Sequence, residues 1–264
     1  MTSLLDLPLE ITDDIIDLLH DDRDALKFCC LVSTLLVPRT RKHLFKDIMI
    51  KDLDMLQRWK KTFPDPSKSP ALVYTHSLIF RDVEDIITGG VMEGCWIQSF
   101  TNVVRLEVCG FAFPSLTGIS LGALHILSAV KSLRLHTIFL PTTEVFKLIC
   151  SLHHLKDLDI RHFFCRYIKD TVEWKDLLQA STSPPLTGTL LTGPRSLGST
   201  VRLLLALPSG LHFRKIVWEI NPHQEVEEVE TLVEACSDTL ECIHTKVHPY
   251  GEPCSFVPCR CFGF

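Results

Sequence analysis

The sequence predicts an α/β protein in which a short helical segment precedes a long series of alternating strands and helices. From residue 45 onward the sequence contains eight copies of a triplet of mostly apolar residues, in which two residues separate the first and second members and one residue separates the second and third. The central residues of the copies are 25 to 32 positions apart, and a spacing this regular indicates a βα solenoid. The segments between the copies fit helical spacing. The central residues are Ile48, Leu78, Leu106, Leu133, Leu158, Leu190, Ile216 and Ile243.

Residues 1–46 predict three short helices. Pro8 suits the first turn of the first helix, where its missing N–H costs nothing. Asp22 and Asp24 are plausible caps for the second helix, and Pro38 sits where a third can begin. One face of the first helix and two sides of the second are apolar. This is more apolar surface than three short helices can bury among themselves. These faces hold Ile11, Ile15, Leu18 and Leu19, then Leu26, Cys29, Cys30 and Ser33, with Leu31 and Val32 on another side.

The order of these pieces resembles the F-box, most closely that of F-box proteins from mushroom-forming fungi. The match covers about residues 4–46 and includes Leu31-Val32-Ser33 and His43-Leu44-Phe45; at Leu36 many F-boxes carry a tryptophan. The resemblance implies docking on the Skp-type adaptor of a cullin-RING ubiquitin ligase. An ordinary helical subdomain packed on the rest of the chain is the alternative. The resemblance assigns adaptor contacts to Leu7, Pro8, Ile11, Leu31, Val32 and Leu36.

Residues 47–250 are expected to form an irregular solenoid that resembles leucine-rich repeats, a horseshoe with the strands lining its concave side. Consecutive parallel strands joined by helices turn in one hand. A conventional doubly wound α/β domain is the alternative. The expected helices span residues 53–63, 121–130, 144–152, 171–178, 201–207 and 226–236.

The asparagine that usually follows the strand in leucine-rich repeats is mostly missing. Its position holds Val83, Phe111, Ile138, Phe163, Asn221 and His248. Without a ladder of side-chain amides the turning backbone needs other partners, so the repeats should be irregular.

Side chains between the buried triplets point to the other face of each strand. Charges of both signs there are expected to bind a target protein by electrostatic complementarity. A solvent-exposed strand face that is simply polar is the alternative. The candidates are Arg81, Arg105, Glu107, Arg134, His136, Asp157, Asp159, Arg161, Lys215 and Glu219.

Composition excludes several functional classes. A net charge of −5 disfavours nucleic acid as a partner, and no apolar run approaches the roughly 18 residues of a membrane span. The start of the chain lacks a basic, signal-like segment, so we expect the cytoplasm or nucleus. In that setting the 11 cysteines do not indicate a disulfide framework. Five of them lie in apolar patterns and are interpreted as core residues: Cys29, Cys30, Cys109, Cys150 and Cys165.

Two motifs have some features of binding sites. Gly188 and Gly193 have the spacing of a phosphate loop, but Pro194 and Arg195 replace its lysine and hydroxyl residue, so a turn is the better interpretation. The tail, residues 251–264, holds three cysteines whose spacing does not match a structural zinc site, and its prolines predict an irregular segment. The sequence therefore predicts no catalytic residue, no cofactor and no metal.

Together these features predict a target-recognition subunit of a Skp-cullin-F-box ubiquitin ligase, which is not itself an enzyme. The helices would dock on the adaptor, and through it on a cullin, while the repeats hold the target. A non-degradative scaffold that binds the adaptor is an alternative. An enzyme built on the carboxy-terminal α/β region is a third hypothesis, and it requires a pocket with converging titratable groups.

Overall fold

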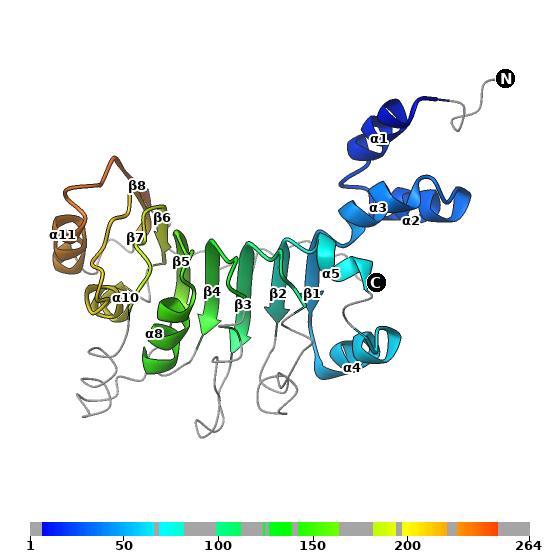
Figure 1. Ribbon diagram of the computed structural model, residues 1–264. Coiled ribbons are helices and arrows are strands. Elements are labelled where there is room, and N and C mark those ends of the chain that lie inside the picture. Colours follow the sequence, from blue (N-terminus) through cyan, green and yellow to red (C-terminus); the bar gives the residue numbers. More distant parts are fainter. Residues whose placement is uncertain are drawn as a thin grey trace.

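A computed structural model describes residues 7–65, 69–81, 99–111, 124, 127–138, 142–163, 182–193, 197–220 and 226–247. These residues form an α/β fold that begins with three helices and continues as a row of strands (Figure 1). The helices are α1 (Leu9–Leu18), α2 (Arg23–Val32), α3 (Val37–Leu44), α4 (Leu53–Thr62), α5 (Pro70–Tyr74), α8 (Thr142–Ser151), α10 (Leu197–Leu205) and α11 (Val226–Ala235). The strands are β1 (Asp47–Ile50), β2 (Ser77–Arg81), β3 (Arg105–Phe111), β4 (Ser132–Ile138), β5 (Asp157–Phe163), β6 (Thr189–Thr192), β7 (Lys215–Ile220) and β8 (Cys242–Val247).

The eight strands form one parallel sheet whose order follows the chain from β1 to β8. The strand pairing aligns the central residue of each predicted triplet with the next, from Ile48 through Leu78 to Ile243, and includes the poor copy around Leu190. A doubly wound sheet reverses its strand order at a switch point, whereas this sheet keeps one direction throughout its described strands. Its strand order therefore differs from that of a doubly wound sheet.

The main core lies between this sheet and the segments that connect its strands. Central residues such as Leu106 and Leu133 are completely buried, and α8 adds Phe146 and Ile149. Full burial of one such side chain contributes roughly 1.5–3 kcal/mol. The repeated triplet is therefore the element of sequence that holds the row of strands together.

The expected helices at 53–63, 144–152, 201–207 and 226–236 are confirmed as α4, α8, α10 and α11. The short α5 was not predicted; Pro70 begins it, at a position where proline is well tolerated. Residues 171–178 lie outside the described residues, as do residues 121–123, 125 and 126. The described residues 127–130 form a turn, so the helix expected there is wrong over that part.

Strand pairing replaces the missing asparagine in the middle of the sheet. Phe111 pairs with Ile138, and Ile138 with Phe163, so β3, β4 and β5 stay paired up to the position that the asparagine would occupy. Just before it the backbone turns left-handed at Gly110 (φ 74°) and at Thr137 (φ 54°). The corresponding positions Val83, Asn221 and His248 lie outside the described residues.

Gly188 and Gly193 serve strand packing. A Cβ on Gly188 would lie 2.2 Å from Asp157 Oδ1 and 2.9 Å from the Lys156 carbonyl oxygen, so no side chain fits there. The same Asp157 Oδ1 accepts a hydrogen bond of 2.7 Å from the Thr189 backbone N–H and joins β5 to β6. Gly188 therefore marks a close approach of two strands, in the segment where the sequence predicted a turn.

The three amino-terminal helices form a separate small unit beyond β1, at one end of the row of strands (Figure 1). Their core consists of Ile16, Leu26 and Leu36, one from each helical region, and Leu19, Cys29 and Leu44 pack around it. The unit adjoins the rest of the chain where α3 lies against α5. On α1 the buried residues are Thr12 and Ile16, while Ile11 and Leu18 of the predicted apolar face are exposed.

Candidate functional site

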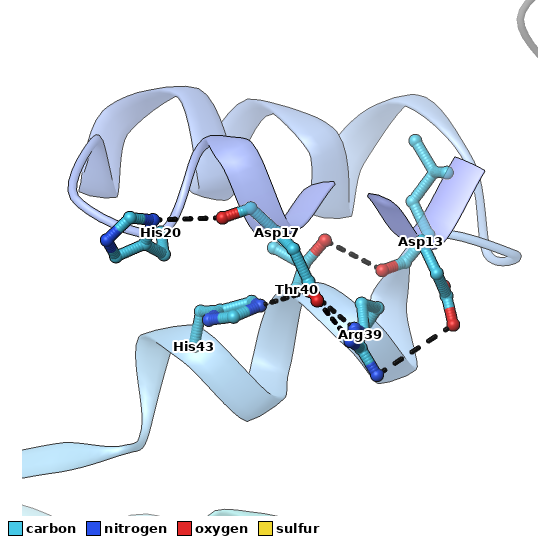
Figure 2. Close-up of polar contacts among 7 residues, drawn as sticks. Asp13, Asp17, His20, Arg39, Thr40 and His43 are labelled. Atoms are coloured by element: carbon cyan, nitrogen blue, oxygen red, sulfur yellow. Dashed lines mark hydrogen bonds and ion pairs between the residues drawn. The ribbon is translucent and has the colours of Figure 1, made fainter. Parts of the chain in front are cut away.

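Polar contacts to one carboxylate fix α1 against α3 (Figure 2). Asp17 Oδ1 accepts a 2.6 Å hydrogen bond from Arg39 Nε, and Asp17 Oδ2 contacts the Arg39 guanidinium as well. His43 Nε2 lies 2.7 Å from Asp17 Oδ1, and Arg39 also lies 4.0 Å from Asp13. The hydrogen bonds from Arg39 and then His43 hold the pKa of Asp17 far below its usual range. The helix pair is therefore set by charge as well as by its small core.

This unit exposes many apolar side chains. Of the eleven large apolar side chains that are exposed in the described part of the chain, eight lie between residues 7 and 35. We call these eight the apolar patch. Its members are Leu7, Leu9, Ile11, Leu18, Phe28, Leu31, Val32 and Leu35.

Five of the six expected adaptor contacts lie on the surface. Leu31 and Val32, at the end of α2, are 82% and 72% exposed, while Leu7, Pro8 and Ile11 are exposed around the start of α1. The expectation for Leu36 is corrected, because Leu36 is 2% exposed and packs against Ile16 and Leu26. A residue in this position stabilises the helical unit and offers no contact area to a partner.

Four members of the patch were not assigned by sequence analysis: Leu9, Leu18, Phe28 and Leu35. Leu18 was placed on the apolar face of the first helix but not among the adaptor contacts. The sequence does not show which side of α1 faces α3. In the structure this is the side that carries Ile16 and Asp17, because both contact the other helices.

The ten residues expected to bind a target all lie at strand positions that alternate with the buried triplets, on what we call the polar face of the sheet. Across β3, β4 and β5 the pairing places Glu107, Arg134 and Asp159 side by side. Arg134 lies 3.6 Å from Glu107 Oε2 and 3.8 Å from Asp159 Oδ2. Charges of opposite sign therefore alternate across neighbouring strands.

The network continues around Arg161. Arg161 Nε donates a 2.9 Å hydrogen bond to Asp159 Oδ1, and Arg161 Nη1 lies 3.5 Å from Glu219 Oε1 on β7. β6 lies between these strands, and Gly193 follows its last paired residue, Thr192. Gly193 carries no side chain, and beside it the side chain of Arg161 crosses β6 and reaches β7.

Carboxylates lie beneath cations on this face. The side chains of Glu107 and Asp159 are about one-tenth exposed, whereas that of Arg134 is 41% exposed. Burial alone would raise the pKa of Asp159, but His136, whose Nε2 lies 3.3 Å from Asp159 Oδ2, and Arg161 together outweigh it, so its pKa is lowered. The groups that a partner meets on this part of the face are mainly guanidinium.

The remaining candidates have varied surroundings. Arg105 is exposed, and Arg81 and Lys215 are half-buried. Asp157 accepts the Thr189 N–H described above, so its carboxylate is used within the fold.

Some of the described cysteines are buried in the core, and others are half-buried. Burial raises the pKa of the Cys150 thiol to about 11, and burial also raises the pKa of Cys236. Such thiols are core residues with little thiolate character. The interpretation of Cys109 as a core residue is wrong, because its side chain is half-buried on the polar face, beside Glu107 and His136. Cys165 lies outside the described residues.

No model of a known protein family matches this sequence, and no curated protein matches it either. The resemblance to the F-box therefore rests on the residues quoted above. Within the described ranges, no helix combines the length and the apolar character needed to cross a membrane.

Proposed function

We propose that this chain is the target-recognition subunit of a Skp-cullin-F-box ubiquitin ligase, with α1–α3 acting as the F-box. The observation that carries the proposal is the apolar patch, since eight exposed apolar side chains gather on a unit of three short helices. Exposed apolar surface of this density marks an interaction site.

The position of the patch supports the assignment. The helical unit keeps its own core of Ile16, Leu26 and Leu36, so the patch does not result from an unformed core. The unit also lies beyond β1 at one end of the row of strands, where a partner can reach it (Figure 1). Together these features favour an adaptor-binding unit over an ordinary subdomain packed on the sheet.

We further propose that the eight repeats form a degenerate leucine-rich-repeat solenoid with the polar face as its concave side. One parallel sheet in chain order, aligned at the predicted triplets, supports this interpretation. The polar face then holds the target through its alternating charges. Catalysis belongs to other subunits, and this chain contributes by keeping the target at high effective concentration near them.

The test is capture of a purified Skp-type adaptor by the full chain. The double variant Pro8→Ala with Ile11→Ala, and a second double variant Leu31→Ala with Val32→Ala, each remove two exposed apolar contacts. Each is expected to weaken adaptor binding by about tenfold or more, because buried apolar contacts dominate such interfaces.

The matched control removes exposed apolar side chains elsewhere. Val73→Ala with Leu205→Ala changes two side chains that are 54% and 43% exposed and lie outside α1–α3. It should bind the adaptor as the wild type does. Undiminished binding by both patch variants, with their circular dichroism unchanged, would refute the proposal. Adaptor binding without any interactor that accumulates when the chain is deleted would instead favour the non-degradative scaffold.

A further inference from the structure

Three metal-ligating side chains converge on the polar face, on two neighbouring strands. Glu107 and Cys109 are two residues apart on β3, so both point to the same side of the sheet. Cys109 is paired in register with His136 on β4. One ligand atom from each of the three residues lies within 4.8 Å of the other two.

We propose that Glu107, Cys109 and His136 bind a zinc ion. Zinc takes thiolate, imidazole and carboxylate ligands in tetrahedral geometry, with bonds of about 2.0–2.3 Å that place neighbouring ligand atoms roughly 3.5 Å apart. Cys109 Sγ and Glu107 Oε1 are already 3.3 Å apart. The imidazole completes the site by approaching these two atoms by about 1 Å, and water takes the fourth position.

The charges and protons of the site balance. Cys109 now donates its thiol hydrogen to Glu107 Oε1. When zinc binds, the sulfur–hydrogen bond is replaced by a sulfur–zinc bond, and the proton leaves to solvent. The thiolate and the carboxylate then supply two negative charges to a dication.

Neighbouring side chains can orient the ligands. Arg134 lies beside Glu107 Oε2, at 3.6 Å, which leaves Oε1 for the metal. Asp159 Oδ2 lies 3.3 Å from His136 Nε2, and a carboxylate at one ring nitrogen is the usual support of a histidine that binds metal through the other. Arg161 in turn holds Asp159 through a 2.9 Å hydrogen bond.

The donor set selects among metals. Magnesium and calcium prefer oxygen ligands only, so a thiolate and an imidazole disfavour both. A mixed set of sulfur, nitrogen and oxygen suits zinc. The inference does not depend on adaptor binding, since α1–α3 contribute nothing to this site.

The experiment uses the full chain, stripped with a chelator and then titrated with Zn²⁺, with native mass spectrometry to count bound metal. Cobalt(II) serves as a spectroscopic substitute, because thiolate ligation gives a charge-transfer band in the near ultraviolet. We expect one Zn²⁺ at this site and a thiolate band with Co²⁺. Asp159→Asn should weaken binding by roughly 10- to 100-fold, and Cys109→Ser should weaken it further.

The controls address other cysteines. Cys242 lies 3.2 Å from His244 on β8 and forms a second cysteine–histidine pair, so Cys242→Ser is the matched control and should keep the zinc. A full-length variant with Cys254, Cys259 and Cys261 changed to serine should keep it too. Loss of all zinc from either control, or undiminished binding by Cys109→Ser, would overturn the proposal, as would a wild type that binds none.

A second measurement needs no variant at the site. Zinc should slow alkylation of Cys109 in the wild-type chain, mapped by peptide mass, while leaving the rate at Cys242 unchanged. Equal rates at Cys109 with and without zinc would also refute the site, even if Cys109→Ser fails to fold.

Discussion

Replacing Asp17 by asparagine isolates the electrostatic contact that joins α1 to α3. Asparagine keeps the size of the side chain and one acceptor oxygen, but it removes the charge that Arg39 and His43 approach. The local stability of the helical unit should fall, while the sheet should keep its stability because its core is separate.

The expected magnitude follows from the geometry. Charge-assisted hydrogen bonds contribute about 1.5–3 kcal/mol where they are shielded, but exposed ion pairs contribute only about 0.2–1 kcal/mol. The Asp17 side chain is 37% exposed, whereas those of Arg39 and His43 are 29% and 15% exposed, which places the contact between these limits. We therefore expect Asp17→Asn to cost about 1–2 kcal/mol after solvent screening. That cost multiplies the population of the locally opened unit by roughly 5 to 30.

The dependence on pH gives a second, signed expectation. The folded-state pKa of Asp17 is lowered below its unfolded value, so its ionised form is favoured by folding. The stabilisation is therefore complete above about pH 4, the ordinary range of an aspartate, and is lost as pH falls toward the folded-state pKa. The difference between wild type and Asp17→Asn should shrink on acidification below about pH 4.

Native-state hydrogen exchange measures this directly, because the amide of Thr40 is hydrogen-bonded to Leu36 inside the unit. Asp14→Asn is the matched control, since Asp14 is an exposed carboxylate on the same helix that acts on Arg39 only through its charge. Equal exchange of Thr40 in wild type and Asp17→Asn at pH 7, or a difference that grows at low pH, would refute the reasoning.

Three further predictions concern stability, measured by urea denaturation unless stated. Leu36→Ala should destabilise the helical unit by about 2–5 kcal/mol, measured by hydrogen exchange, because it removes a buried side chain. Leu35→Ala, at the adjacent exposed residue, should change the stability by no more than about 0.5 kcal/mol. Equal effects of the two variants would contradict the assigned burial. Gly188→Ala should lower the free energy of unfolding by about 1–3 kcal/mol, because its Cβ would meet Asp157 and backbone atoms. Gly193→Ala should be nearly neutral, because its Cβ makes ordinary contacts at 3.5 Å. The reverse order of the two effects would count against the strand packing. Thr137→Gly should be neutral or stabilising by about 0.5 kcal/mol. Glycine removes the strain of a β-branched residue in the left-handed region, and this gain offsets the larger conformational entropy that glycine loses on folding. A loss of stability above about 1 kcal/mol would show that the contacts of the threonine side chain outweigh this strain.

The sequence by itself determined the strands, their order and their register. The triplet pattern is local, and side chains alternate faces with a period of two, so burying one triplet in each repeat leaves a single alignment of neighbouring strands. The triplets alone therefore align Leu78 with Leu106 and Leu106 with Leu133, as the strand pairing has them. The apolar excess of the first helices was equally predictable, because composition alone shows that three short helices cannot bury so much surface.

Only the tertiary structure decided which side chains meet. Asp17 and Arg39 are 22 residues apart, and their contact depends on how α1 is rotated against α3, which also buries Ile16 and Leu36. Arg161 reaches Glu219 across β6, beside Gly193, through a contact between strands that are not neighbours. The convergence of Cys109 on Glu107 and His136 likewise requires two strands in register and a half-buried position. These contacts depend on packing between segments distant in the chain, whereas periodicity reports only which face of its own segment a residue occupies.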